Sequence, residues 1–159
     1  MPKITPMLWF DDQAEQAAEL YTSVFPNSRI TEVNRYGEAG PGTPGGVMTV
    51  AFELDGERFV ALNGGPQPFH FDESISFVID CGDQDEVDHY WGALTADGGE
   101  EGPCGWLKDR FGVSWQVVPR RLLELIGDPD RDRAQRAMAC MLEMKKIDIA
   151  ALEEAAAAG

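Results

Sequence analysis

The segment Gly102–Pro119 reads GPCGWLKDRFGVSWQVVP and predicts two β-strands joined by a tight turn. Gly105–Lys108 and Val113–Val118 are rich in the aromatic and aliphatic side chains that favour strands. The DRFG between them ends in a glycine, which adopts the positive φ of a tight turn at little cost. Pro119 ends the second strand because proline has no N–H to donate to a neighbouring strand.

The second strand of this hairpin carries one side chain of special interest, Gln116. Successive side chains of a strand point to opposite faces, so Trp115 and Val117 share one face. Gln116 lies on the other face, with Ser114 and Val118. It is therefore a hydrogen-bonding group on an otherwise apolar strand. Two interpretations stay open: this face meets solvent, or the Gln116 amide contacts a ligand.

The order of predicted elements occurs twice along the chain. In each copy a strand precedes a helix, and further strands follow. The pattern D-Q-x-E, a helix N-terminal cap, occurs at Asp12–Glu15 and again 71 residues later at Asp83–Glu86. Repetition at half-domain length predicts two modules with pseudo-twofold symmetry. The first copy comprises strand Ile4–Phe10, a helix ending near Phe25, and strands Arg29–Tyr36, Val47–Leu54 and Arg58–Asn63; the second comprises strand Ile75–Cys81, a helix containing Val87–Leu94, and the hairpin.

Two connections in the first copy have clear local signals. Asp55-Gly56 is a strong hairpin-turn signal between its last two strands. The loop 37–46, GEAGPGTPGG, holds five glycines and two prolines. Its glycines do not match the spacings of phosphate-binding loops, and no helix pattern follows, which excludes a phosphate cradle. The loop is a flexible connector or a mobile lid over a pocket.

Three segments of the chain resemble one known family. GWLKDRFGVSWQVVP resembles the closing hairpin of the vicinal-oxygen-chelate superfamily, which includes glyoxalase I, bleomycin-resistance proteins and extradiol dioxygenases. CGWLKDRFGVSWQ, ITPMLWFDD near the start and MLEMKKIDIAALE near the end resemble its PhnB-like branch, often labelled demethylubiquinone methyltransferase-like. The resemblance implies an α+β fold in which two βαβββ modules form a cup of curled mixed sheet. This domain spans 1–119, with modules 1–66 and 72–119.

The segment 120–159 follows both modules and is a predicted helical C-terminal extension. A short helix Arg120–Ile126 ends at Gly127, and Asp130 or Asp132 caps the next helix. Its apolar positions are Ala134, Ala137, Met138, Met141 and Leu142, joined by Ile147, Ile149 and Leu152 in the tail. Left exposed, they form a larger apolar patch than monomers tolerate. The resemblance also implies pairing, so we predict a homodimer that buries this patch. The alternative is that the extension folds back on its own sheets.

Charge and cysteine content exclude several classes of function. The formal net charge is −15, from 28 acidic and 13 basic residues, which argues against partners such as nucleic acids or anionic membranes. Only residues 120–146 have an excess of bases, 7 against 5 acids, and they are a docking element or simply solvated. The three cysteines have no metal-type spacing, and no apolar run approaches the ~20 residues that span a bilayer. With no signal peptide visible, we expect a cytoplasmic protein with reduced thiols.

The resemblance implies four metal ligands, His or Glu, one on each of four cup strands. Neither residue type occurs at the corresponding positions of this chain. Divalent transition metals prefer imidazole, thiolate or carboxylate to neutral amide and hydroxyl oxygens. We therefore expect no native catalytic metal and no cofactor, with a weakly bound divalent metal as the alternative. The corresponding positions are Thr5 or Pro6, Leu62 or Asn63, Ser76, and Gln116.

The remaining reactive side chains form no catalytic constellation, so catalytic residues stay unassigned. His89 lies among acids in a predicted helix and is most simply solvated. His70, between two phenylalanines in the linker 64–74, is a candidate ligand contact. Cys104 is a small buried hydrophobe or a reactive thiol. The methyltransferase label fails on physical grounds, because no strand is followed by the GxGxxG turn of a nucleotide-binding sheet.

Three functions compete, and whether the protein is an enzyme stays open. The first is a small-molecule-binding protein with its ligand in the cup, where the acidic body favours a cationic ligand, as in the bleomycin-resistance branch. The second is a metal-dependent enzyme of lyase, isomerase or dioxygenase type on a vicinal-oxygen substrate. The third is an interaction protein acting through its C-terminal helices. Polar groups at the lost ligand positions favour the first. Its predicted ligand contacts are Asn63, Ser76 and Gln116, with Trp9, Tyr36 and Trp106 as walls and His70 as a further contact.

Overall fold

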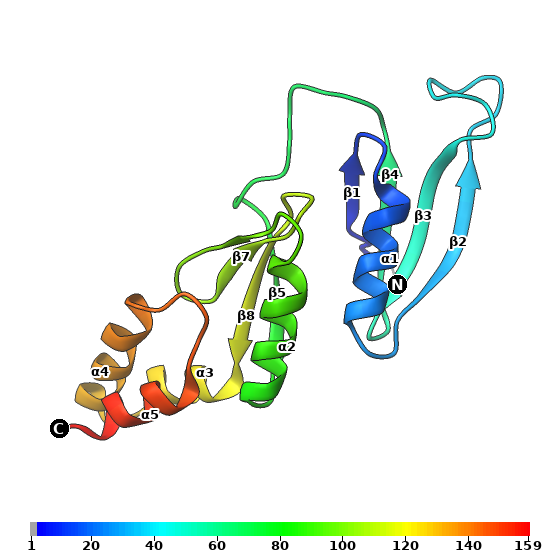
Figure 1. The fold of residues 1–159 in the computed structure, drawn as a ribbon. Coiled ribbons are helices and arrows are strands. Elements are labelled where there is room, and N and C mark those ends of the chain that lie inside the picture. The colour runs from blue at the N-terminus through cyan, green and yellow to red at the C-terminus, as the bar shows by residue number, and fades with distance from the viewer. Residues whose placement is uncertain (1–2) are drawn as a thin grey trace. The chain divides into compact units, whose positions relative to one another are not determined.

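The computed structural model describes residues 3–159 and divides into two compact units. The first unit ends at Phe69 and the second begins at His70, so the boundary falls within the predicted linker 64–74. Each unit holds one four-stranded sheet and one helix packed on it, and the second unit carries three further helices (Figure 1). The assignment of 1–119 and 120–159 as separate parts stays a prediction.

Unit 1 has the predicted order of one strand, one helix and three strands. Its elements are β1 (Met7–Phe10), α1 (Ala14–Val24), β2 (Arg29–Arg35), β3 (Val47–Leu54) and β4 (Glu57–Asn63). The sheet order is β1-β4-β3-β2, and it is mixed because β1 runs parallel to β4 while the other pairs are antiparallel. Asp55 and Gly56 both have positive φ, 47° and 85°, which confirms the predicted hairpin turn. β1 is shorter than predicted: Ile4 is 97% exposed, and the ladder begins with Met7 opposite Val60.

Helix α1 covers one face of the unit 1 sheet, against β3 and β4 (Figure 1). Alternation along β1 buries Leu8 and Phe10. Met7 and Trp9, which alternate with them, are 59% and 40% exposed. Phe52 of β3 is fully buried and forms part of the core on the helix side. Within unit 1, the other sheet face therefore carries exposed apolar side chains.

Unit 2 repeats the same arrangement. Its elements are β5 (Ser76–Cys81), α2 (Gln84–Thr95), β6 (Glu100–Glu101), β7 (Trp106–Lys108) and β8 (Ser114–Pro119). The sheet order is β5-β8-β7-β6, with β5 parallel to β8 as β1 is to β4. The repeat and the α+β class predicted from the sequence are confirmed. The sheet of each unit is an open four-stranded sheet.

The two D-Q-x-E motifs behave differently, and the first prediction is wrong. Asp83 caps α2 by accepting a hydrogen bond from the Glu86 N–H at 2.9 Å, as predicted. Helix α1 instead begins after Gln13, which makes no side-chain capping bond within residues 3–159. The N–H of Ala14 donates to Asn63 Oδ1 at 2.8 Å. The end of β4 thus places an amide oxygen where the local motif would have supplied a carboxylate.

The hairpin Gly102–Pro119 is organised by the buried carboxylate of Asp109, which is 2% exposed. It accepts hydrogen bonds from Phe111 N at 2.9 Å and Val113 N at 3.1 Å. Its other oxygen accepts from the indole N–H of Trp115 at 2.9 Å. These bonds satisfy the turn's N–H groups and connect the turn to β8, so the Asp109 carboxylate stabilises the hairpin as a buried hydrogen-bond acceptor.

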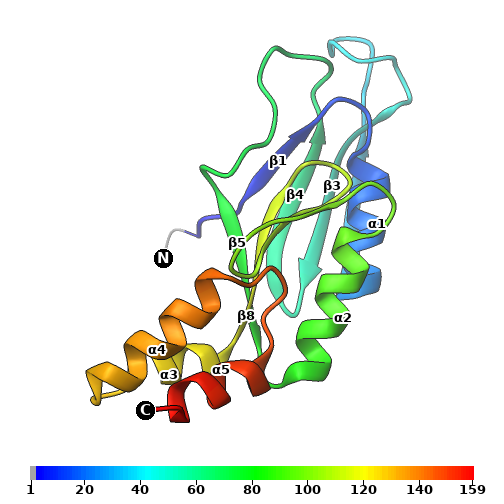
Figure 2. The ribbon, with the colours of Figure 1, turned by 60° about the vertical axis from the view of Figure 1, so that its left-hand side comes forward.

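The C-terminal helices are α3 (Arg120–Ile126), α4 (Arg131–Leu142) and α5 (Ile149–Ala157), gathered beyond the end of β8 (Figure 2). Asp130 caps α4, which settles the choice between the two predicted caps. The three helices share a core whose buried members are Leu122, Leu125, Ala137, Ile147, Leu152 and Ala156. The premise of an exposed apolar patch is therefore wrong for Ala134, Ala137, Ile147 and Leu152, which are buried within the chain. Leu142 alone of the predicted face is strongly exposed, at 60%.

The connector between α4 and α5 fastens the extension to the rest of unit 2. The N–H groups of Cys104 and Gly105 donate to Met144 O and Lys145 O, each at 2.8 Å. Gln84, at the start of α2, donates through Nε2 to Ile147 O at 2.9 Å and accepts from Ile149 N through Oε1 at 2.9 Å. Backbone pairing of this kind makes the extension an integral part of the unit.

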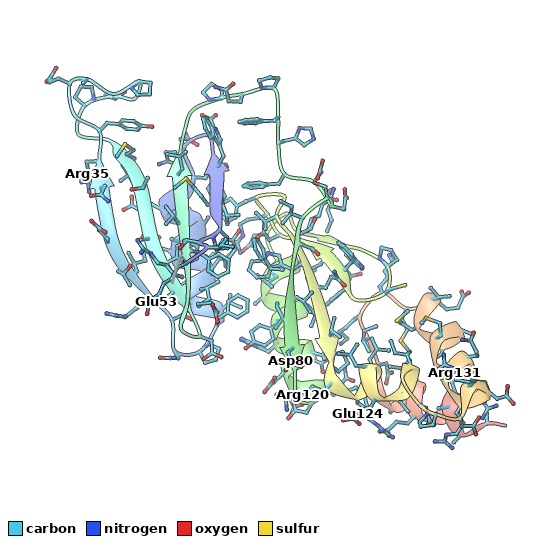
Figure 3. All side chains as sticks on the ribbon, turned by 180° about the vertical axis from the view of Figure 1, so that it is seen from behind. Arg35, Glu53, Asp80, Arg120, Glu124 and Arg131 are labelled. Atoms are coloured by element: carbon cyan, nitrogen blue, oxygen red, sulfur yellow. The ribbon has the colours of Figure 1, made fainter. Side chains whose placement is uncertain are left out.

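Most bases of segment 120–146 have partners inside unit 2, and the paired side chains stay solvent-exposed, as expected of solvated charges. The docking role stays a prediction. Arg120 pairs with Asp80 at 3.0 Å, which Figure 3 shows beside it at the end of β5. Most of the other bases also hold an intramolecular partner. These pairs are Arg121 with Glu124 and Glu153, Arg133 with Asp128, Lys146 with Asp88, and Arg136 with the carbonyl of Ala156. No helix within residues 3–159 is long and apolar enough to cross a membrane.

Candidate functional site

The face of the unit 2 sheet opposite α2 is the surface on which Gln116 lies, and we call it the Gln116 face. Alternation assigns its members, because Ile79, Cys81, Trp115 and Val117 are buried on the α2 side. Strand register arranges the residues of this face in three rows. The first row is Ser76, Ser114 and Lys108; the second is Val78, Gln116 and Trp106; the third is Asp80 and Val118.

Gln116 and Ser76 form a polar pair at the centre of this face. The Gln116 Nε2–H donates to Ser76 Oγ at 3.0 Å, and both side chains are half-buried. Trp106 lies opposite Gln116 on one side and Val78 on the other. The hydrogen bond joins two of the predicted ligand contacts, and Trp106, a predicted wall, lies next to them. Their role in ligand binding stays a prediction.

Two ion pairs border the Gln116 face, and neither was predicted. Lys108 Nζ lies 2.5 Å from Glu73 Oε1 at the Ser76 end, and Arg120 Nε lies 3.0 Å from Asp80 Oδ2 at the other end. The hydrogen bond from Lys108 lowers the pKa of Glu73, and the same bond raises the pKa of Lys108. The hydrogen bond to Asp80 raises the pKa of Arg120. At each end of the face, the acidic and the basic side chain therefore compensate each other's charge. Alternation along β7 could have placed Lys108 on the same face as Trp106, but no local signal indicates that Glu73 or Arg120 is a partner in these pairs.

A cavity of about 340 Å³ opens beside the first row. Trp106, Lys108 and Ser114 line it from the Gln116 face, and Glu73 also lines it. The remaining lining residues are Glu100, Glu101, Gly102, Pro103 and Leu107. The cavity combines an aromatic ring, a compensated ion pair and an aliphatic edge, the mixture found in small-molecule pockets.

In unit 1, Asn63 and Tyr36 hold the backbone together. The Asn63 amide accepts from Ala14 N and donates to Val47 O at 3.1 Å, so both of its polar ends have partners. The Tyr36 hydroxyl donates to the Asn63 carbonyl at 2.5 Å. The Tyr36 ring packs against Gly40 and Gly42, where an added Cβ would come within 2.7 Å and 2.4 Å of it. Asn63 was predicted as a ligand contact and Tyr36 as a wall of the site. Both make hydrogen bonds that stabilise unit 1, which the sequence did not reveal.

Backbone hydrogen bonds join the loop 37–46 to Tyr36. Tyr36 N donates to Gly46 O, and Gly45 N donates to Tyr36 O, each at 2.8 Å. The loop and the start of α1 enclose a cavity of about 610 Å³ that Asn63 and Tyr36 also line. Its charged lining residues within the described chain are all acidic: Asp11, Asp12, Glu15 and Glu19. The cavity is thus an acidic region, and the loop is one of its walls.

Trp9 belongs to unit 1 and His70 to unit 2, and each has its own surroundings there. The Trp9 indole N–H donates to Gly65 O at 3.0 Å, and its ring meets Phe69 edge-to-face at 5.2 Å. An added Cβ at Gly64 would come within 2.2 Å of the Trp9 ring, so the chain needs glycine there. His70 lines a separate cavity of about 350 Å³ in unit 2, with Arg110 among its neighbours. Their predicted contact with a ligand stays a prediction.

The residues at the superfamily's metal positions do not fit a transition metal. Ser76 and Gln116 are neutral and bonded to each other, and the Asn63 amide is used by two backbone groups. Within residues 3–159 no group of three His, Cys, Asp or Glu side chains could hold a metal ion. Burial raises the pKa of the Cys81 thiol to about 12, which keeps it protonated and unreactive. No nucleophile or metal centre emerges from these positions.

Comparisons with known proteins agree with this architecture. The family model described as 3-demethylubiquinone-9 3-methyltransferase matches residues 2–118. The solved structure of a PhnB protein from Bacillus cereus is 33% identical, with a TM-score of 0.66 over 74% of this chain and 99% of that one. Protein PA1353 from Pseudomonas aeruginosa is 19% identical, with a TM-score of 0.63 over 75% and 98% of the two chains. The fosfomycin resistance protein FosX from Listeria monocytogenes is 14% identical, with a TM-score of 0.51 over 75% and 93%. The last two show a shared fold only, and no curated protein matches the chain.

Proposed function

Because the chain belongs to the 3-demethylubiquinone-9 3-methyltransferase family, the PhnB-like branch of the vicinal-oxygen-chelate superfamily, we propose that it is a small-molecule-binding protein. Its ligand lies on the Gln116 face. The observation that carries the proposal is the Gln116–Ser76 pair, set between Trp106 and Val78 beside a cavity of about 340 Å³. Polar groups of this kind orient a ligand, and the flanking apolar groups supply most of its binding energy.

Two further parts of the proposal concern chemistry. We propose that the ancestral metal ligands have been lost, since neutral Ser76 and Gln116 stand at two of their positions. We also propose that the protein is not a methyltransferase that uses S-adenosylmethionine. Both four-stranded sheets are mixed, whereas the nucleotide-binding methyltransferase sheet is mostly parallel with helices on both faces.

The remaining parts concern assembly and location. We propose a cytoplasmic homodimer that binds neither nucleic acid nor membranes, consistent with a net charge of −15. The pairing rests on the family resemblance alone, because the extension's core is buried within the chain. Light scattering at micromolar protein tests it: a mass near 17.5 kDa would reject the dimer. Asn63, Tyr36, Trp9 and His70 remain proposed secondary contacts.

A thermal-shift screen of a small-molecule library tests the binding function. A ligand present at 100 times its Kd stabilises the folded protein by about 2.7 kcal/mol. Hits are expected to lose this shift in Gln116→Leu and in Trp106→Ala, and to keep it in the control Gln135→Leu, which alters an exposed glutamine of α4. Hits that keep their full shift in both Gln116→Leu and Trp106→Ala would refute the site. Near-stoichiometric transition metal in protein purified without chelator would favour the alternative, a metal-dependent enzyme.

A further inference from the structure

The Gln116–Ser76 pair leaves donors and acceptors for a ligand. With one Nε2–H donating to Ser76 Oγ at 3.0 Å, the remaining groups are the Gln116 carbonyl oxygen beside the second Nε2–H, and the Ser76 hydroxyl hydrogen with one Oγ lone pair. If the amide turns over, Ser76 donates to Oε1, and the remaining groups are both Nε2–H hydrogens, one lone pair of Oε1 and the lone pairs of the hydroxyl oxygen. In both arrangements the pair presents a donor beside an acceptor.

Four charged groups at the ends of the Gln116 face form two ion pairs. Glu73 and Lys108 face each other at one end of the Gln116 face, and Asp80 and Arg120 at the other. A charged ligand between them would therefore meet no unpaired opposite charge from these four groups. The protein's net charge of −15 disfavours anions further. Glu100 and Glu101 also line the neighbouring cavity, so local charge disfavours an anion, and the choice between a cationic and an uncharged ligand depends on the hydrogen-bonding groups of the pair.

The groups beside the pair are flat and apolar. Trp106 stands in register with Gln116 on β7, half-buried, and offers one ring face or edge to a neighbour. Val78 stands in register on β5 and is 61% exposed. A planar ligand can cover Trp106 and Val78 while its polar edge meets the pair between them.

We propose, building on the binding function proposed above, that the ligand is an uncharged planar molecule whose N–H and C=O lie side by side, as in a lactam or cyclic imide. Such an edge pairs with the donor and the acceptor together. A carboxylate offers only acceptors, so it leaves the Gln116 carbonyl oxygen without a donor. An ammonium group offers only donors, so it leaves the second Gln116 N–H and the Ser76 hydroxyl hydrogen without an acceptor. A site built for both groups rejects ligands that lack one of them.

Three probes of similar size test this class on the full chain: 2-quinolone, 2-naphthoate and 2-naphthylmethylammonium. Titrations are followed through the side-chain amide signals of Gln116 and the indole signal of Trp106 in ¹⁵N-labelled protein. We expect 2-quinolone to bind at least about tenfold more tightly than either charged probe and to shift both signals. Equal or tighter binding of a charged probe at Gln116 would overturn the ligand class while leaving the binding function standing. If no probe moves either signal, and the library hits described above also leave them unmoved, the binding function and the ligand class both fail.

A charge-changing variant gives the sharper test. Gln116→Glu keeps the shape of the side chain but makes it an acceptor only. We expect it to lose at least about tenfold in affinity for 2-quinolone and to bind 2-naphthylmethylammonium more tightly than the wild type does. Gln135→Glu adds the same charge at an exposed position of α4 and should keep the wild-type order. If Gln116→Glu does not fold, Gln116→Leu serves instead and should bind 2-quinolone no better than naphthalene. An unchanged probe order in either variant overturns the proposal.

Discussion

Replacing Gln84 by alanine should loosen the C-terminal extension. The Gln84 side chain donates to Ile147 O and accepts from Ile149 N, both at 2.9 Å and both part-buried. Each bond contributes about 1 kcal/mol net, and its loss leaves a backbone group short of a partner, so the variant should lose about 2–3 kcal/mol of unfolding free energy. In a chain of this size, that loss lowers Tm by roughly 4–12 °C.

The repeat supplies a matched control for this experiment. Gln13 holds the same position in the first D-Q-x-E motif but makes no capping bond within the described chain. Gln13→Ala should therefore change Tm by less than about 2 °C. Hydrogen exchange adds a local readout, because the amide of Ile149 loses its acceptor in Gln84→Ala and should exchange faster, while the amides of β3 should not. Equal Tm values for Gln84→Ala and Gln13→Ala, with unchanged exchange at Ile149, would refute the role assigned to Gln84.

Three further outcomes are expected. Hydrogen bonds from Lys108, Gln84 and the Asp130 backbone lower the pKa values of Glu73, Asp88 and Asp128, respectively. The ionised carboxylates therefore stabilise the fold above pH ~4, and this stabilisation is lost as the pH falls through the lowered pKa values. The urea midpoint should drop below pH ~4, and the drop should be smaller in Lys108→Met. Asp109→Ala removes the acceptor of the backbone N–H groups of Phe111 and Val113 and of the Trp115 indole N–H. The variant should lose about 3 kcal/mol or more of unfolding free energy in urea, and a loss below about 1 kcal/mol would contradict the organising role of Asp109. In a Cys104→Ser/Cys140→Ser variant, Cys81 should react with a disulfide reagent at pH 8 only after denaturation, because burial raises its pKa to about 12; rapid reaction of the native variant would contradict its burial.

The fold was predictable because its sequence signals are local and occur in both halves of the chain. Alternation, turn residues and helical spacing each depend on neighbours in sequence, and they gave β3 (Val47–Leu54) and α3 (Arg120–Ile126) at their observed limits. Asp55-Gly56 and the DRFG turn depend on φ preferences of one or two residues. The predictions failed where a partner came from elsewhere in the chain. Asp12 lost its capping role to Asn63, which lies 49 residues beyond the capped Ala14.

The candidate site was only partly predictable for the same reason. Alternation placed Gln116 on a face, and the repeat with the family resemblance led to Ser76, but nothing local showed that the two side chains bond to each other. The ion pair of Asp80 with Arg120 joins residues 40 apart, and no sequence spacing marks it. The apolar positions of the extension were found correctly, yet spacing could not tell burial within the chain from burial between two chains.

The position of the extension follows from the edge of the unit 2 sheet. β6 spans only Glu100–Glu101 and pairs with Leu107 and Lys108 of β7. On the side away from β8, the backbone just before β7 therefore has no strand beside it within residues 3–159. The N–H groups of Cys104 and Gly105 would stand unpaired at this edge, a surface that invites another chain to pair with it. The carbonyls of Met144 and Lys145 accept both bonds at 2.8 Å. Gly105 has φ +85°, and an added Cβ would come within 2.9 Å of Val117 O, so the glycine is required by the hairpin itself. The family model matches residues 2–118, so this edge lies within the matched part of the chain and the extension that covers it lies outside that match.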